Sequence, residues 1–281
     1  MNLAILAPLL ALLLACNALA AEEPAPARSV LLATTTSVRD SGLLDRLLPI
    51  FSAETGIAVQ AVAVGTGAAL RMGREGNADI LLTHAPSAEK AMLADGSLAN
   101  RIEIMENYFV IAGPGDDPAG VAQAATAQAA LARIHRLELP FVSRGDDSGT
   151  HKREQELLTD AGIDPDVKWP GLTRTGSGMG ISLQVAGQRQ AYILSDIGTY
   201  LAFHQRIDLA ALSRPEPGLR NIYSVLLVNP EKFPRVRGEE ASRLADFLQG
   251  EEAQSIMLAF GTEKFGRPLF TPLNPTTGGL P

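Results

Sequence analysis

Short apolar runs alternate with helix-like patterns from residue 29 onward, and this alternation constrains the fold more than any other feature. Residues 29–33 form a strand-like run, and leucines then recur at helical spacing from Leu43 to Phe51. Strand-like runs at 57–64 and 79–83 follow, each with a helix-like segment after it. Such alternation predicts β-α-β units with parallel strands.

A second alternating pattern begins after the strand-like run 106–113. The Pro- and Gly-rich segment 114–118 is typical of a crossover, and the apolar run 221–228 could return the chain to the first unit. The sequence therefore predicts two α/β lobes joined by two crossings, each a mostly parallel sheet flanked by helices. The predicted limits are 29–112 and 226–281 for the first lobe and 113–225 for the second.

Two local signals predict where helices start. Ser37 and Asp40 have the spacing of a capping box, and residues 121–135 have the pattern of one continuous helix. Gly56 is expected to end the helix that contains Phe51.

Three runs of small hydroxyl residues and glycine stand where a strand-like run stops and a helix-like pattern begins. They lie at 34–37, 64–67 and 143–151. Ligands of open parallel sheets bind beyond the carboxyl ends of the strands. Helix N-termini there offer unpaired N–H groups and partial positive charge, which suit an anion. We therefore predict an oxyanion site in a cleft between the lobes.

Arg144 is the strongest single candidate because its guanidinium is always charged and its donors match a tetrahedral oxyanion. Asp146 could hold that group in place; an ordinary surface ion pair is the alternative. The other expected ligand residues offer hydroxyl or backbone N–H groups: Thr35, Thr36, Ser37, Thr66, Ser148, Gly149, Thr150 and Ser177. For these residues helix capping or a plain turn is the alternative interpretation.

Composition excludes several classes of protein. Apolar residues make up 46% and charged residues 20% of the chain, which fits a globular protein with an ample core. The net charge of −7 argues against nucleic acid or an anionic membrane surface as partner. It would also repel an anion, so capture must depend on local donors.

Catalytic and metal-binding patterns are poorly represented. The four histidines are scattered and Cys16 is the only cysteine, so we expect no metal and no cofactor, with Asp146, Asp147 and His151 as the alternative metal set. A phosphate-ester hydrolase using Ser148 with His151 or His84 as base is an alternative function, although no G-x-S-x-G motif is present. We expect no enzymatic activity. A secreted anion-sensing domain is the other alternative.

The N-terminal stretch 3–21 is rich in Leu and Ala and is followed by no comparable span. We interpret residues 1–20 as a signal peptide, which predicts a periplasmic protein. Two cleavage sites compete. Residues 18–20 form an A-x-A site that would release a soluble protein, whereas 13–16 resemble a lipoprotein box that would leave lipid on Cys16.

The three runs closely resemble those of the tungstate-binding periplasmic components of ABC transporters. The matching segments are 34–44, 64–70, 79–86, 143–151, 178–180 and 191–200. The resemblance implies a two-lobed solute-binding protein with the type II periplasmic-binding-protein fold. Such a protein closes on tungstate, or on molybdate, and delivers it to an ABC permease. We expect it to act as a monomer.

A more distant similarity helps to choose among anions. Residues 144–150 are similar to a run of phosphate-binding proteins, which also carry an aspartate that accepts the proton of hydrogen phosphate; His84 stands at that place here. A cleft of donors suits a fully deprotonated dianion, and phosphate would bring an unmatched donor. The tungstate-binding family usually has Gly-Gln-Gly-Met-Gly where this chain has Ser177 at the second position of 176–180, so the preference between tungstate and molybdate stays open.

Overall fold

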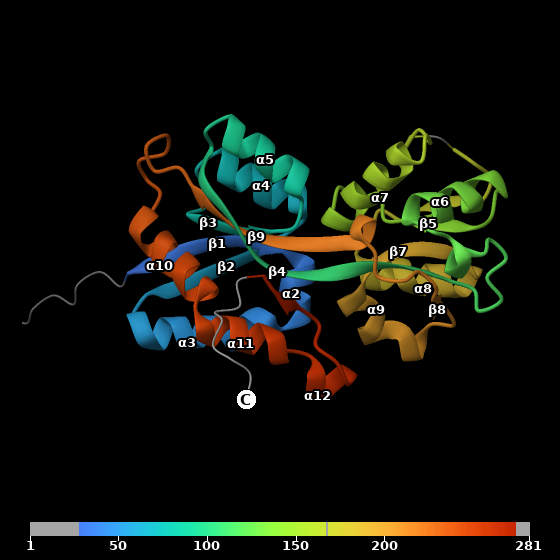
Figure 1. The fold of residues 1–281 in the computed structure, drawn as a ribbon. Coiled ribbons are helices and arrows are strands. Elements are labelled where there is room, and N and C mark those ends of the chain that lie inside the picture. Colours follow the sequence, from blue (N-terminus) through green and yellow to red (C-terminus); the bar gives the residue numbers. More distant parts are fainter. Residues whose placement is uncertain (1–27, 167, 274–281) are drawn as a thin grey trace, which may run out of the picture.

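The alternating strands and helices fold into two α/β lobes that lie side by side (Figure 1). The structure, a computed structural model, describes residues 28–166 and 168–273. The predicted signal peptide and Cys16 lie outside the described residues. Within those two ranges no helix combines the length and the hydropathy that crossing a bilayer requires.

The first lobe is built on a sheet whose parallel part has the order β2-β1-β3, with antiparallel β9 and β4 continuing it. Its strands are β1 (Ser29–Thr35), β2 (Ala58–Val64), β3 (Ile80–Thr83), β4 (Leu98–Gly113), β9 (Arg220–Val228) and the short β10 (Thr271–Pro272). Its helices are α2 (Thr36–Ser41), α3 (Leu43–Thr55), α4 (Thr66–Arg74), α5 (Pro86–Ala94), α10 (Gly238–Gln249), α11 (Glu251–Ala259) and α12 (Thr262–Phe265).

Apolar residues cover both faces of this sheet, as its buried parallel strands require. In β3, Ile80 and Leu82 pack against α3, α10 and α11, whereas Leu81 packs on the other face against α4 and α5. Alternate residues of a strand point to opposite faces, so four consecutive apolar or Thr residues supply two cores at once. Gly56 ends α3 in the left-handed conformation, as predicted.

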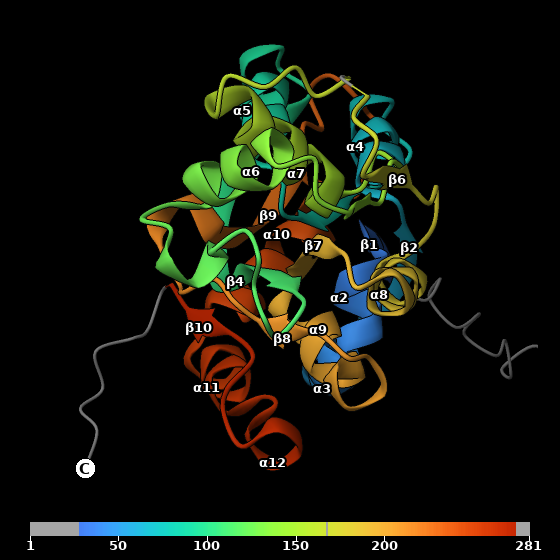
Figure 2. The same cartoon turned by 90° about the vertical axis from the view of Figure 1, so that its right-hand side faces the viewer.

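The second lobe contains the parallel order β7-β5-β6, with part of β4 antiparallel to β7. Its strands are β5 (Phe141–Ser143), β6 (Leu172–Arg174), β7 (Tyr192–Asp196) and β8 (Ala210–Ala211). Its helices are α6 (Ala127–Arg136), α7 (Gly149–Asp160), α8 (Met179–Arg189) and α9 (Ile197–Phe203), with single 3-10 turns η1 (Val121–Gln123), η2 (His204–Arg206) and η3 (Pro217–Leu219). Helices α6 and α7 cover one face and α8 and α9 the other (Figure 2).

Strand β4 belongs to both lobes. It pairs with β9 as far as Tyr108 and with β7 from Phe109 to Ala112. Asn107 and its cross-strand partner Asn221 therefore lie where the two lobes join. The residue limits proposed above for the lobes stay a prediction.

Two local expectations were wrong, and one strand was missed. Helix α2 starts after Thr35 without a side-chain cap, and Asp40 pairs with Arg39, so residues 37 and 40 form no capping box. The segment 121–135 is divided, because α6 begins only after Thr126, whose side chain accepts a hydrogen bond from the N–H of Ala129. Strand β6 was not predicted; it has three residues and no hydrophobic periodicity.

Candidate functional site

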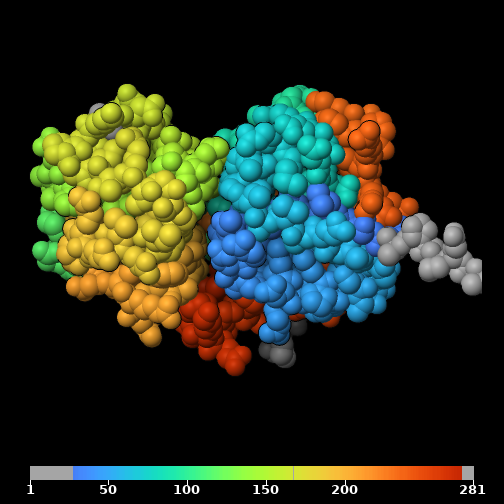
Figure 3. All heavy atoms as spheres, turned by 180° about the vertical axis from the view of Figure 1, so that it is seen from behind, coloured from blue at the N-terminus to red at the C-terminus, as the bar shows by residue number. Residues whose placement is uncertain are grey.

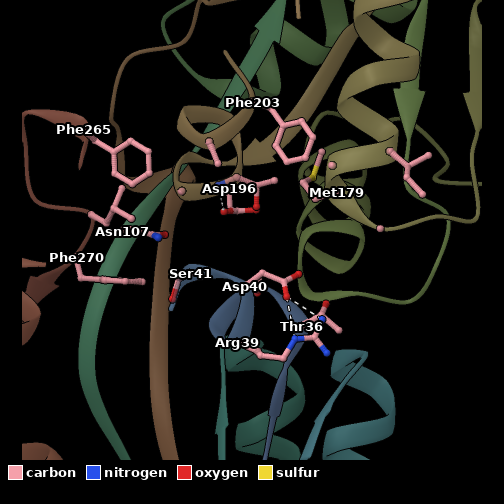
Figure 4. Close-up of a pocket in the computed structure, with 18 of the residues that line it drawn as sticks. Thr36, Arg39, Asp40, Ser41, Asn107, Met179, Asp196, Phe203, Phe265 and Phe270 are labelled. Atoms are coloured by element: carbon pink, nitrogen blue, oxygen red, sulfur yellow. Dashed lines mark hydrogen bonds and ion pairs between the residues drawn. The ribbon is translucent and has the colours of Figure 1, made fainter. Parts of the chain in front are cut away.

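A cavity of about 430 Å³ opens between the lobes, and both lobes line it. Figure 3 shows the surface hollowed between them, and Figure 4 shows the residues inside. The first lobe contributes Thr36 and Ser37 of α2. The second lobe contributes Arg144 after β5, Met179 at the start of α8 and Asp196 at the start of α9. The lining is completed by Asn107 and Tyr223 from the strands that join the lobes and by the rings of Phe203, Phe265 and Phe270.

Arg144 brings a buried positive charge to this cavity. Its side chain is 7% exposed, and one terminal nitrogen, Nη2, donates to Asp146 Oδ2 at 2.5 Å. Its Nε is buried and has no hydrogen-bond partner among the described residues. A buried donor without an acceptor costs about 1–3 kcal/mol, and more when it is charged. Arg144 lines the cavity, so an anion bound there would lie beside this incompletely paired positive charge.

Hydroxyl groups of the first lobe form a chain of hydrogen bonds. Thr35 Oγ1 lies 3.0 Å from Ser37 Oγ, which lies 3.2 Å from His84 Nε2. The other ring nitrogen of His84, Nδ1, lies 2.9 Å from Asn221 Oδ1. The end of β1, the loop after β3 and the start of β9 are thereby tied together beside the cavity.

His84 is neutral at physiological pH. Burial lowers the pKa of its imidazole to about 4, and the positive charge of Arg144 acts in the same direction. Only one ring nitrogen of a neutral imidazole carries a proton. His84 therefore adds no positive charge to the site.

The lobes touch at two glycines next to the cavity. A Cβ at Gly149, the first residue of α7, would lie 2.4 Å from Cε1 of His84. A Cβ at Gly67 would lie 2.0 Å from Oδ2 of Asp147. Gly149 needs the small residue because it meets the buried ring of His84, whereas Gly67 meets only the end of the exposed Asp147 side chain.

The structure brings most of the predicted site residues to this region. Thr36, Ser37 and Arg144 line the cavity, and Thr35 is hydrogen-bonded to Ser37. Thr66, Ser148 and Thr150 are buried, and Gly149 lies beside them; they belong to the two segments that meet where Gly67 approaches Asp147. Ser177 does not line the cavity, and its hydroxyl donates to the carbonyl of Thr175 at 3.2 Å. The ligand roles of all these residues stay predictions.

Sequence reasoning missed Asp196, which lines the cavity and is buried. Burial raises the pKa of its carboxyl group. Its Oδ1 accepts from the backbone N–H of Thr199 and its Oδ2 from the Thr199 hydroxyl, both at 2.8 Å. Asp196 therefore caps α9, and the strand-to-helix boundary before Gly198 was the signal that could have identified it.

A second buried carboxyl group, Glu154 of α7, lies in the same lobe. Burial raises its pKa to about 8, so it is mostly protonated at neutral pH. The surroundings of Arg144 therefore carry less negative charge than the sequence suggests. In the two described ranges, no three His, Cys, Asp or Glu residues are grouped so that they could hold a metal ion.

Two lobes joined by shared strands, with a polar cavity between them, define the class of two-lobed solute-binding proteins. A family model described as "PBP superfamily domain" matches residues 20–252. A tungstate-binding protein TupA of Peptoclostridium acidaminophilum is 44% identical over 246 residues, which span 87% of this chain and 85% of that protein. A TupA of Campylobacter jejuni is 35% identical over 83% of this chain and 87% of its own length.

A solved structure of a tungstate-binding protein TupA from Desulfovibrio alaskensis G20 superimposes with a TM-score of 0.77. It is 40% identical, and the match covers 88% of this chain and 99% of that one. The chain belongs to the PBP superfamily and, within it, to the TupA family of tungstate-binding proteins.

Proposed function

We propose that this protein captures tungstate in the periplasm and delivers it to an ABC permease. Two relatives that align over most of its length are named tungstate-binding proteins, which supports this ligand. A similar solved structure, from Geobacter sulfurreducens, is described as "the tungstate ABC transporter" (43% identity, TM-score 0.71, 81% of this chain and 97% of that one), which supports the partner. A role as a monomer, export through residues 1–20 and lipid on Cys16 are parts of this proposal that await measurement.

The observation that carries the proposal is the unpaired Nε of the buried Arg144 guanidinium. Arg144 lines a cavity whose opposite wall includes Thr36 and Ser37 of the first lobe. A tetrahedral dianion offers acceptors in every direction, so it can satisfy donors from both lobes at once. Binding of this kind favours closure of the lobes around the ligand.

The site should discriminate against phosphate because the protein offers few hydrogen-bond acceptors for a protonated ligand. At pH 7 phosphate always carries at least one proton, as hydrogen phosphate or dihydrogen phosphate, and that proton needs an acceptor in the site. His84 stands where phosphate-binding proteins have an aspartate, and Asp196 on the cavity wall is used as the cap of α9. We expect the proton of hydrogen phosphate to find no partner, whereas tungstate and molybdate bring acceptors only.

We propose that the protein has no catalytic activity and no cofactor. Ser148 Oγ accepts from the backbone N–H of His151 at 3.3 Å, as a helix cap does, and both ring nitrogens of His84 are engaged by Ser37 and Asn221. Within the described residues no hydrogen bond joins Ser148 to a histidine ring, which is the pairing a serine nucleophile needs. A sensing role would use the same cavity and differ only in the membrane partner.

A thermal-shift panel of tungstate, molybdate, sulfate and phosphate tests the proposal. A ligand that binds only the native state raises the melting temperature with its concentration. We expect tungstate to raise it strongly and phosphate to have little effect; sulfate is also a deprotonated dianion, so its response tests whether the cavity selects by size. No shift with tungstate would overturn the proposed ligand. Turnover of a generic phosphate ester that Ser148→Ala abolishes would overturn the binding role in favour of hydrolysis.

A further inference from the structure

Two buried asparagines face each other across the strands that join the lobes. Asn221 Nδ2 donates to Asn107 Oδ1 at 2.8 Å and to the hydroxyl of Tyr223 at 2.9 Å. Asn107 Nδ2 lies 3.5 Å from the same hydroxyl. Asn107 and Tyr223 line the cavity between the lobes.

The direction of these hydrogen bonds is set by His84. Asn221 turns its carbonyl oxygen toward His84 Nδ1, so the neutral imidazole carries its proton on that nitrogen. His84 Nε2 is then an acceptor and takes the hydroxyl hydrogen of Ser37. With its oxygen committed to His84, Asn221 can present only its NH₂ group to Asn107 and Tyr223.

The hydroxyl oxygen of Tyr223 therefore accepts hydrogen bonds from the amide groups of the two asparagines. Its own hydrogen is left to be donated to another acceptor. A phenolic hydroxyl has one hydrogen to donate, and in the described part of the chain this one donates to no side chain or backbone group. Asp196 is the nearby carboxylate on the cavity wall, but among the described residues no hydrogen bond joins it to the Tyr223 hydroxyl. The remaining direction for the Tyr223 hydrogen is the cavity itself.

The ring of Tyr223 is held in place on two sides. It lies 4.8 Å from the ring of His84 and 5.5 Å, edge to face, from the ring of Phe270. The residue is only 2% exposed. A donor fixed in this way can bind an anion without the cost of ordering a mobile side chain.

We propose that Tyr223 donates its hydroxyl hydrogen to the bound oxyanion and that Asn221 orients that hydroxyl. This inference rests on the proposed binding function and adds a ligand group from the strands that join the lobes. Ser37 then contributes to the site without its hydroxyl hydrogen, because His84 takes it.

Calorimetric titration with sodium tungstate tests the proposal on three proteins: wild type, Tyr223→Phe and the control Tyr200→Phe. The hydroxyl of Tyr200 is also buried, but it donates to the carbonyl of Leu209 away from the cavity. Removing a hydrogen bond to a charged group weakens binding about 10- to 100-fold. We expect that loss for Tyr223→Phe and an unchanged Kd for Tyr200→Phe, with melting temperatures of the free proteins confirming that both variants fold.

Equal Kd values for wild type and Tyr223→Phe would overturn the inference while leaving the proposed function intact. Failure of wild type to bind tungstate would overturn the proposed function itself. A double-mutant cycle tests the orienting role: Asn221→Ala should weaken binding less in the Tyr223→Phe background than in wild type. Additive losses would show that Asn221 does not act through Tyr223.

Discussion

The two walls of the cavity are built from different kinds of polar group. The first-lobe wall contains Thr35, Ser37 and the neutral His84, whose hydrogen bonds are made within that lobe and to Asn221. The second-lobe wall contains the charged Arg144, whose Nε has no partner among the described residues. One wall is internally satisfied, and the other still needs an acceptor.

This difference indicates how much each wall contributes to the free energy of binding. An unpaired buried cation gains most from an anion, so the second lobe should supply most of the binding free energy. The first lobe should supply mainly the shape of the closed cleft, because the hydroxyl hydrogens of Thr35 and Ser37 are used within that wall. Five substitution experiments test that division, from the largest expected effect to the smallest.

Arg144→Ala should lower the affinity for tungstate by at least about 2–3 kcal/mol, because it removes charge-assisted hydrogen bonds. Calorimetry gives the change directly. Arg39→Ala is the matched control: Arg39 also lines the cavity but is exposed and paired with Asp40, so its loss should change affinity by less than about 0.5 kcal/mol. Unchanged affinity in Arg144→Ala would remove this residue from the site.

His84 should make the first lobe sensitive to acid. The native pKa of about 4 lies below the unfolded value of 6.5, so the unfolded chain binds more protons between these pH values and stability falls as pH falls. From pH 7 to pH 5 the contribution of His84 to the free energy of unfolding should drop by about 2 kcal/mol. Urea unfolding of wild type and His84→Gln measures it: the variant should gain stability relative to wild type on acidification.

Glu154 should give the second lobe the opposite pH dependence. Its native pKa of about 8 lies above the unfolded value of 4.5, so stability falls as pH rises through that window. Glu154→Gln should therefore gain stability relative to wild type as pH rises from 5 to 8 in the same unfolding experiment. If the free energy of unfolding of both variants changed with pH as it does in wild type, neither His84 nor Glu154 would have the shifted pKa that its burial indicates.

Gly149→Ala should weaken tungstate binding about tenfold, or ~1.4 kcal/mol. The added Cβ meets the ring of His84, which two hydrogen bonds hold in place, so the lobes can no longer approach as closely. Gly67→Ala is the comparison variant, and its effect should be smaller because the Asp147 side chain it meets is 68% exposed and can turn away. A larger loss in Gly67→Ala than in Gly149→Ala would contradict this explanation.

Ser177→Ala should change tungstate affinity by less than about 0.5 kcal/mol. Its hydroxyl donates to Thr175 and lies outside the cavity lining, despite the place of Ser177 in a glycine-rich run before α8. Calorimetry comparing it with wild type decides the matter. A tenfold loss would return Ser177 to the ligand set and imply that the closed state moves this loop.

Much of the fold could be predicted from local patterns. The runs that became β1, β3 and β9 are apolar because their strands are largely buried, and the helix after β1 shows its leucine spacing. The errors arose where local signals are weak or ambiguous. Strand β6 is too short to show a hydrophobic period. Asp40 forms an ion pair with Arg39 instead of the hydrogen bond to the backbone that a capping box requires.

The sequence by itself determined that the chain would alternate strands and helices, and that hydroxyls, glycines and one arginine would follow strand ends. Those properties are local, since they depend on side-chain spacing and on the chemistry of neighbouring residues. Only the tertiary structure decided that Asn107, Asn221 and Tyr223 would meet His84 beside Arg144. These residues come from segments far apart in the chain, and the hydrogen bonds and burial that set their charge and direction exist only once the strands between the lobes have paired.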